Sequence, residues 1–141
     1  MEILTLCFVS LLLAGAQVVG GANADVNANA CASQTIDVRV GREINVPGQR
    51  LKIKFVAVRE DSRCPVGVTC VWAGNARVAL KLTKARMRAV DLELNTATTE
   101  PQEGDALGYQ VRLAKLVPHP VNNQKLNPRD YVATLAVTKK S

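Results

Sequence analysis

The residues with the greatest chemical potential are four cysteines and a single histidine. Cys64 and Cys70 enclose five residues that include Pro65 and Gly67, which suits a tight turn closed by a disulfide. A disulfide reductase needs two cysteines with only two residues between them, so the five residues between Cys64 and Cys70 are too many for that chemistry. A structural zinc site needs four ligands, and the cysteines beyond residue 24 do not cluster with His119. We therefore expect a structural disulfide between Cys64 and Cys70, and no metal or other cofactor.

The other polar residues form no recognisable catalytic constellation. The chain has no nucleophile elbow and no glycine-rich phosphate loop. Asp91 and Glu93 lie two apart on an alternating stretch, which predicts solvated side chains on one face of a strand. The sequence thus favours a protein that is not an enzyme. The alternative is an enzyme of unrecognised type that uses Asp61, Arg63 or His119.

The residues around the two cysteines form a dense motif over positions 60–74. We expect Asp61 to accept backbone N–H bonds in an Asx-type turn, and Arg63 to bond that carboxylate or nearby carbonyls and to lie on the face of Trp72. Two hypotheses follow. In the favoured one the motif is a stapled loop with Trp72 buried over the disulfide, while in the other Arg63 and Trp72 form a small binding surface. The residues of this motif loop are Asp61, Ser62, Arg63, Pro65, Trp72 and Gly74.

This motif resembles a segment of an uncharacterised family of small exported bacterial proteins that carry the pattern DSRCP-x4-CxWAG. In this chain DSRCP occupies positions 61–65 and C-V-W-A-G occupies positions 70–74. The direct resemblance covers 60–74, and a looser one extends to the strand that follows and to the C-terminal strand. The resemblance implies export and supports the cysteine pair, but it implies no reaction and no ligand.

The N-terminus predicts a signal peptide. Residues 3–19 form an apolar run that is shorter than the roughly 20 residues of a membrane span, and Ala22-Asn23-Ala24 follows it. We expect a signal peptide over 1–24, cleaved after Ala24 or, as an alternative, after Ala30. The region before the run carries Glu2 and no basic residue, which departs from the usual signal. An uncleaved N-terminal anchor is the competing interpretation.

We therefore expect a periplasmic or secreted protein with no stable membrane span after cleavage. Residues 25–33 are rich in Asn and Ala and predict a flexible leader. Cys31 lies in that leader, and its state as free, paired or lipidated stays open.

The exported chain is basic. All 18 Lys and Arg follow residue 24, whereas one of the 12 acidic residues, Glu2, precedes it, so 18 positive and 11 negative charges give the exported chain a net charge of about +7. Such a charge favours an anionic partner, for example an acidic polysaccharide. The basic residues are spread along the chain, and this argues against nucleic acid as a partner.

Beyond the leader, apolar residues recur with period two, the pattern of half-buried strands. The pattern predicts a single all-β domain over 34–141, an antiparallel β-sandwich or open barrel of about six to seven strands. A phase slip predicts a β-bulge near Ala114, and residues 95–104 are expected to form a mobile turn. The expected apolar faces are Ile36/Val38/Val40, Leu51/Ile53/Phe55, Val78/Leu80/Leu82, Val90/Leu92/Leu94, Tyr109/Val111/Leu113 and Tyr131/Ala133/Leu135/Val137, with a short strand at 44–46.

The favoured function is an exported accessory or binding module of the bacterial cell envelope, acting on a protein or an anionic polysaccharide. A secreted inhibitor that uses the disulfide loop is an alternative. Because loops carry function on β scaffolds, residues 59–74 and 118–129 are the expected functional segments.

Overall fold

A computed structural model describes residues 32–141, so the expected signal peptide and Cys31 lie outside the described residues. Within 32–141 the chain is all-β, as the period-two pattern predicts, and contains no helix, hence none that could cross a membrane. The strands are β1 (Ser33–Arg39), β2 (Glu43–Asn45), β3 (Leu51–Asp61), β4 (Ala76–Lys84), β5 (Val90–Asn95), β6 (Glu103–Ala106), β7 (Tyr109–Val117) and β8 (Val132–Lys139).

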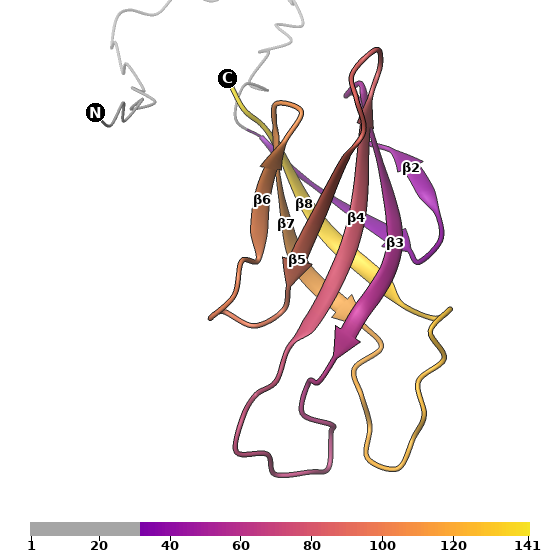
Figure 1. Cartoon of the computed structure of the whole chain (residues 1–141), viewed down its shortest axis with the longest axis vertical. Helices are drawn as coiled ribbons and strands as arrows, with labels where there is room; N and C mark the ends of the chain where they lie inside the picture. Colours follow the sequence, from indigo (N-terminus) through magenta and orange to yellow (C-terminus); the bar gives the residue numbers. More distant parts are fainter. Residues whose placement is uncertain (1–31) are drawn as a thin grey trace, which may run out of the picture.

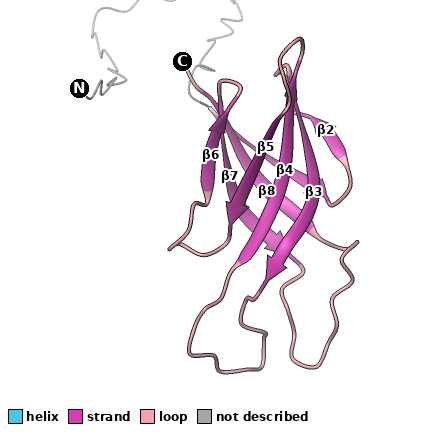
Figure 2. Cartoon of the chain, viewed as in Figure 1, coloured by secondary structure: helices cyan, strands magenta, loops and turns pink. Residues whose placement is uncertain are grey.

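The strands form two antiparallel sheets that face each other (Figures 1 and 2). One sheet has the order β1-β8-β7-β6 and the other has the order β2-β3-β4-β5. The sheets do not close into a barrel, so of the two predicted architectures the sandwich is the one observed.

The core lies between the sheets and is built by alternate residues of each strand. On β3, Leu51, Ile53 and Phe55 are buried while Lys52 and Lys54 are exposed. Such alternation places one face of each sheet in the core and the other in water. The largest fully buried side chains are Phe55, Leu51, Ile53, Leu80, Leu82, Leu94, Leu135, Val38, Val46, Val78 and Val111.

One detail differs from the predicted strands. The expected mobile turn at 95–104 is wrong at its C-terminal end, because β6 begins at Glu103 and pairs with β7. Its sequence gave no signal because Ala106 is the only apolar residue in it. Gly104 fits this strand closely, since a Cβ there would lie 2.5 Å from a methyl group of Leu92. The sandwich therefore has eight strands instead of six to seven.

The predicted bulge is confirmed. The pairing of β7 with β8 shifts by one residue between Leu113 and Lys115. β3 has two further irregularities, between Phe55 and Ala57 and between Val58 and Glu60, and it runs on to Asp61. The long strand therefore delivers the first residue of the motif to the end of the sandwich.

Candidate functional site

Two long loops project together from one end of the sandwich, at the bottom of Figure 1. One connects β3 to β4 over residues 62–75, and the other connects β7 to β8 over residues 118–131. A parallel bridge joins Val66 to Val121. In this bridge the Val66 N–H donates to Pro120 O at 2.9 Å, and the Asn122 N–H donates to Val66 O at 3.1 Å. We call these two connected loops the loop end.

Arg63 anchors the loop end at its junction with the sandwich. Its side chain is buried and forms a two-point ion pair with Asp61, from Nε to Oδ1 at 2.8 Å and from Nη2 to Oδ2 at 2.6 Å. It also donates from Nη1 to the Leu116 carbonyl and from Nη2 to the Pro118 carbonyl, both at 2.8 Å. A guanidinium suits this role because its planar fork presents several donors in fixed directions. One side chain therefore fastens the first loop to the start of the second.

Asp61 is the acceptor at the centre of this network. The Arg63 backbone N–H donates to Asp61 Oδ1 at 3.3 Å, as expected for the predicted Asx-type turn. The Tyr131 hydroxyl donates to Asp61 Oδ2 at 2.8 Å, across 70 positions of sequence. Burial raises the pKa of the Asp61 carboxyl, but the bonds from Arg63 and Tyr131 and the charge of Arg63 outweigh it, so that pKa lies below its ordinary value.

Tyr131 responds in the opposite direction. Burial and the neighbouring Asp61 carboxylate raise the pKa of its phenol from 10.0 to about 12. Asp61, Arg63 and Tyr131 therefore form one hydrogen-bonded network, with Asp61 ionised and Tyr131 neutral, that stabilises the base of the loop end.

The predicted Cys64–Cys70 disulfide is confirmed, and it closes the projecting part of the first loop into a small ring. Within the ring, the Val68 N–H donates to Pro65 O at 3.3 Å, which forms a turn. His119 Nε2 lies 2.8 Å from Cys64 O, so the second loop also holds the ring.

The two arms of the first loop are fastened to each other as well. Ser62 Oγ bonds both the N–H and the carbonyl of Asn75, at 3.1 and 3.0 Å, and the Cys64 N–H donates to Ala73 O. Gly74 has a φ of +71°, and a Cβ there would overlap the Ser62 carbonyl. Only glycine therefore allows this close approach of the arms.

The prediction that Trp72 is buried over the disulfide is wrong. Its side chain is 81% exposed, and that of Val71 is 89% exposed. Arg63 occupies the space where the loop joins the sandwich. The loop projects beyond the ends of the strands, so no strand covers the indole. The expected stacking of Arg63 on Trp72 is also not observed: within residues 32–141 the cation–π contact is between Lys84 and Tyr109.

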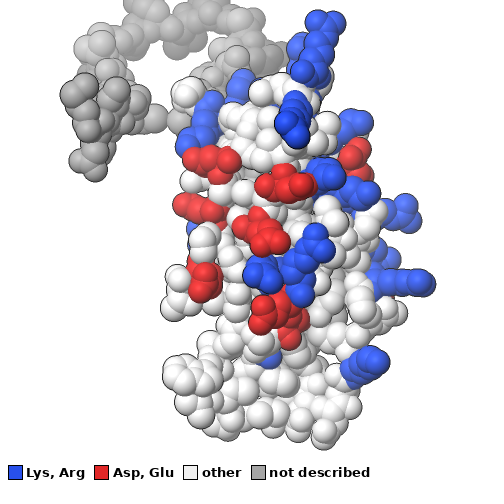
Figure 3. All heavy atoms as spheres, in the orientation of Figure 1, with Lys and Arg blue, Asp and Glu red and all other residues white. Residues whose placement is uncertain are grey.

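The first loop of the loop end carries most of the exposed large apolar side chains, and this end has few charged ones. Val66, Val68, Val71 and Trp72 are four of the five exposed large hydrophobic residues in the described part of the chain. Residues 62–75 contain no Asp or Glu, and Asp130 is the one acidic residue of 118–131. Figure 3 shows the same end of the molecule as almost entirely free of charged side chains, whereas the strands above it carry many. The gathering of exposed apolar side chains at one end makes this surface the candidate functional site.

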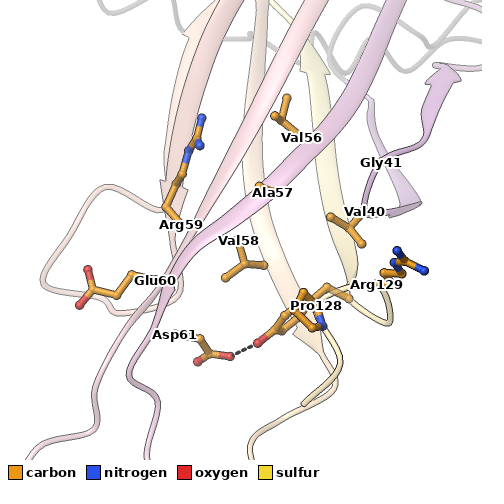
Figure 4. A pocket seen from close by; sticks show the side chains of 11 residues that line it. Val40, Gly41, Val56, Ala57, Val58, Arg59, Glu60, Asp61, Pro128 and Arg129 are labelled. Atoms are coloured by element: carbon orange, nitrogen blue, oxygen red, sulfur yellow. Dashed lines mark hydrogen bonds between the residues drawn. The ribbon is translucent and has the colours of Figure 1, made fainter. Parts of the chain in front are cut away.

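A shallow groove of about 480 Å³ lies beside the loop end (Figure 4). Val40, Val58 and Pro128 give it an apolar lining, and Arg129 stands at its rim. Asp61 reaches its lower end but is already bonded to Tyr131, as the dashed line in Figure 4 marks. Arg59 and Glu60 also line the groove, and they form ion pairs with Glu93 and Arg77.

The residues considered for catalysis make contacts with other protein groups. Asp61 and Arg63 neutralise each other, and His119 contacts a backbone carbonyl. Within the described residues no group of three or more His, Cys, Asp or Glu side chains could hold a metal ion. The sequence did not identify Tyr131 or the carbonyls of Leu116 and Pro118 as hydrogen-bond partners of Asp61 and Arg63, because these residues are far from the motif in sequence.

Comparisons of the chain with models of protein families, with curated proteins and with solved structures find no match.

Proposed function

We propose that this protein is an exported binding module of the bacterial cell envelope and that the loop end is its contact surface. The observation that carries this proposal is the exposure of two adjacent apolar side chains, Val71 and Trp72. They lie on a loop that the hydrogen bonds of Arg63 hold to the sandwich. Exposing an indole to water costs free energy that burial in a complex recovers. A contact surface accounts for this arrangement, while a structural staple does not.

The rigidity of the loop end supports the same proposal. The disulfide, the Arg63 network and the bridge between Val66 and Val121 hold both loops in one conformation before any partner arrives. Prior ordering lowers the entropy cost of binding. Aromatic residues and a low content of charge are also typical of the centre of a binding surface.

Export is the second part of the proposal. The Cys64–Cys70 disulfide is compatible with an oxidising compartment, and the apolar run at 3–19 followed by Ala22-Asn23-Ala24 supports a signal peptide. We propose cleavage after Ala24 and a periplasmic or secreted location. When the gene is expressed with its leader, the exported protein should begin at Asp25.

The proposal is tested by binding to isolated bacterial envelopes. We expect the exported protein to sediment with envelopes, and Trp72→Ala to reduce the bound fraction strongly without lowering the unfolding temperature. Met87→Ala is the matched control, because Met87 is exposed but lies in the turn between β4 and β5, at the other end of the sandwich. Equal sedimentation of the wild type and Trp72→Ala would remove the loop end from the proposed function.

A secreted inhibitor is the second candidate, because the disulfide ring projects and is held rigidly by the second loop. Such a loop can enter the cleft of a partner enzyme. Under this alternative, replacing Pro65 or Val68 within the ring should weaken binding as much as replacing Trp72, and the bound partner should be a single enzyme that loses activity.

A further inference from the structure

The apolar residues of the loop end lie on one loop. We call Val66, Val68, Val71 and Trp72 the apolar patch; all four belong to the loop between β3 and β4. Three are aliphatic and the fourth is the only tryptophan of the chain. Tryptophan favours the boundary between water and lipid, because its ring is apolar and its N–H is a hydrogen-bond donor.

The backbone of this loop has many of its hydrogen bonds made internally. The N–H groups of Cys64, Val66 and Val68 donate to carbonyls of the loop end. The carbonyls of Cys64 and Val66 accept from His119 and Asn122. Backbone groups that enter a medium poor in water need such partners, since each unpaired group there costs several kcal/mol. These bonds lie between Cys64 and Val68, so this part of the loop meets a requirement for entry into the surface of a bilayer.

The charge of the loop end is complementary to an anionic surface. Residues 62–75 contain no acidic side chain, and residues 118–131 contain one, Asp130, beside the two cations Lys125 and Arg129. Lys125 and Arg129, on the second loop, have no ion-pair partner within the described residues. The exported chain as a whole carries about +7. Each Lys or Arg near an anionic membrane adds to the attraction, so the loop end combines apolar and electrostatic contributions.

We infer that the loop end docks on the surface of an anionic lipid bilayer, with the apolar patch at the level of the headgroups and acyl chains and with Lys125 and Arg129 on the lipid phosphates. This inference rests on the proposed function, for which it names the partner. An acidic polysaccharide would satisfy the cations but leave the three valines in water. A protein partner would have to supply a matching cavity for side chains more than 80% exposed at a projecting end, whereas a fluid bilayer needs none.

The test is co-sedimentation with vesicles of phosphatidylcholine, with and without phosphatidylglycerol. Each variant is used in the form recovered after export. All variants then have the same N-terminal residues, so any contribution of these residues to vesicle binding cancels when the partition coefficients are compared. We expect binding to the vesicles that contain phosphatidylglycerol, with a shift of Trp72 emission to shorter wavelength. Val71→Asp should lower the partition coefficient by roughly tenfold or more, while Met87→Asp, at the opposite end, should leave it unchanged.

A second pair of variants tests the electrostatic part. Lys125→Gln with Arg129→Gln should lower the partition coefficient by roughly fivefold per cation. Arg86→Gln with Arg88→Gln removes the same charge from the turn between β4 and β5 and should have a much smaller effect.

The inference is overturned if the wild type does not bind anionic vesicles, or if Val71→Asp and Met87→Asp bind them equally. Such a result leaves the proposed function standing when the wild type still sediments with whole envelopes and Trp72→Ala does not. In that case the partner is another envelope component, a protein or an anionic polysaccharide. Failure of both assays removes both proposals.

Discussion

Replacing Arg63 by alanine should destabilise the protein more than any other single change in the motif. The Arg63 side chain is 7% exposed and donates four hydrogen bonds, to both carboxylate oxygens of Asp61 and to the carbonyls of Leu116 and Pro118. Its removal leaves a poorly exposed carboxylate with only the hydroxyl of Tyr131 and the backbone N–H of residue 63 as donors, and it leaves two carbonyls without this donor. Breaking a buried ion pair from one side costs about 3–5 kcal/mol.

This loss is a large part of the 5–15 kcal/mol by which folded domains are typically stable. It should appear in equilibrium unfolding by urea as a lower midpoint with little change in slope. Arg63→Lys should recover only part of the loss, because an ammonium group cannot serve both carboxylate oxygens and both carbonyls in the geometry of the fork.

A double-mutant cycle identifies the cause. Asp61→Asn removes the charge that Arg63 neutralises, so the free energy lost on Arg63→Ala should be smaller in the Asp61→Asn background. A loss below about 1 kcal/mol for Arg63→Ala in the wild-type background, where truncation of a buried network is expected to cost more, would refute the assignment of Arg63 as the anchor of the loop end.

The remaining predictions concern the same end of the molecule. Because the folded-state pKa of Asp61 is depressed, its stabilisation is present above the ordinary carboxyl pKa and should be lost as the pH falls through the folded value, more steeply in the wild type than in Asp61→Asn. The pKa of Tyr131 is raised from 10.0 to about 12, so its contribution is complete below pH 10.0 and should decline toward about 12, a decline that Tyr131→Phe removes. Gly74→Ala should cost more than about 1 kcal/mol in urea unfolding, because of the positive φ and the overlap with Ser62. Replacing Cys64 and Cys70 together by serine should cost about 2 kcal/mol by chain entropy for so small a ring, and peptide mapping without reductant should show these two cysteines linked.

The fold follows from the sequence to a large extent, because burial on one face of a sheet imposes a period of two. The strands with strong alternation, such as β3 and β4, are observed where the pattern predicts them. β6 is not predictable in this way, since it is held by pairing with β7 and has only Ala106 as an apolar residue.

The site was predictable only where its contacts are local. The bond between Asp61 and Arg63 follows from their spacing of two residues, and the cysteine pair follows from its small ring. Tyr131 lies 70 positions from Asp61, so their hydrogen bond depends on how the sheets bring β3 beside the start of β8. The predicted burial of Trp72 is wrong because it rests on the usual burial of an indole. Here the Arg63 side chain occupies the space between the loop and the sandwich.

The most direct test of the loop end as a contact surface uses the fluorescence of Trp72, the only tryptophan in the chain. In the free exported protein the emission should be at long wavelength and readily quenched by soluble quenchers, because the side chain is 81% exposed. On addition of bacterial envelopes it should shift to shorter wavelength and become protected from the quencher. Emission that is already at short wavelength in the free protein, or that does not change while the protein binds, would contradict the account.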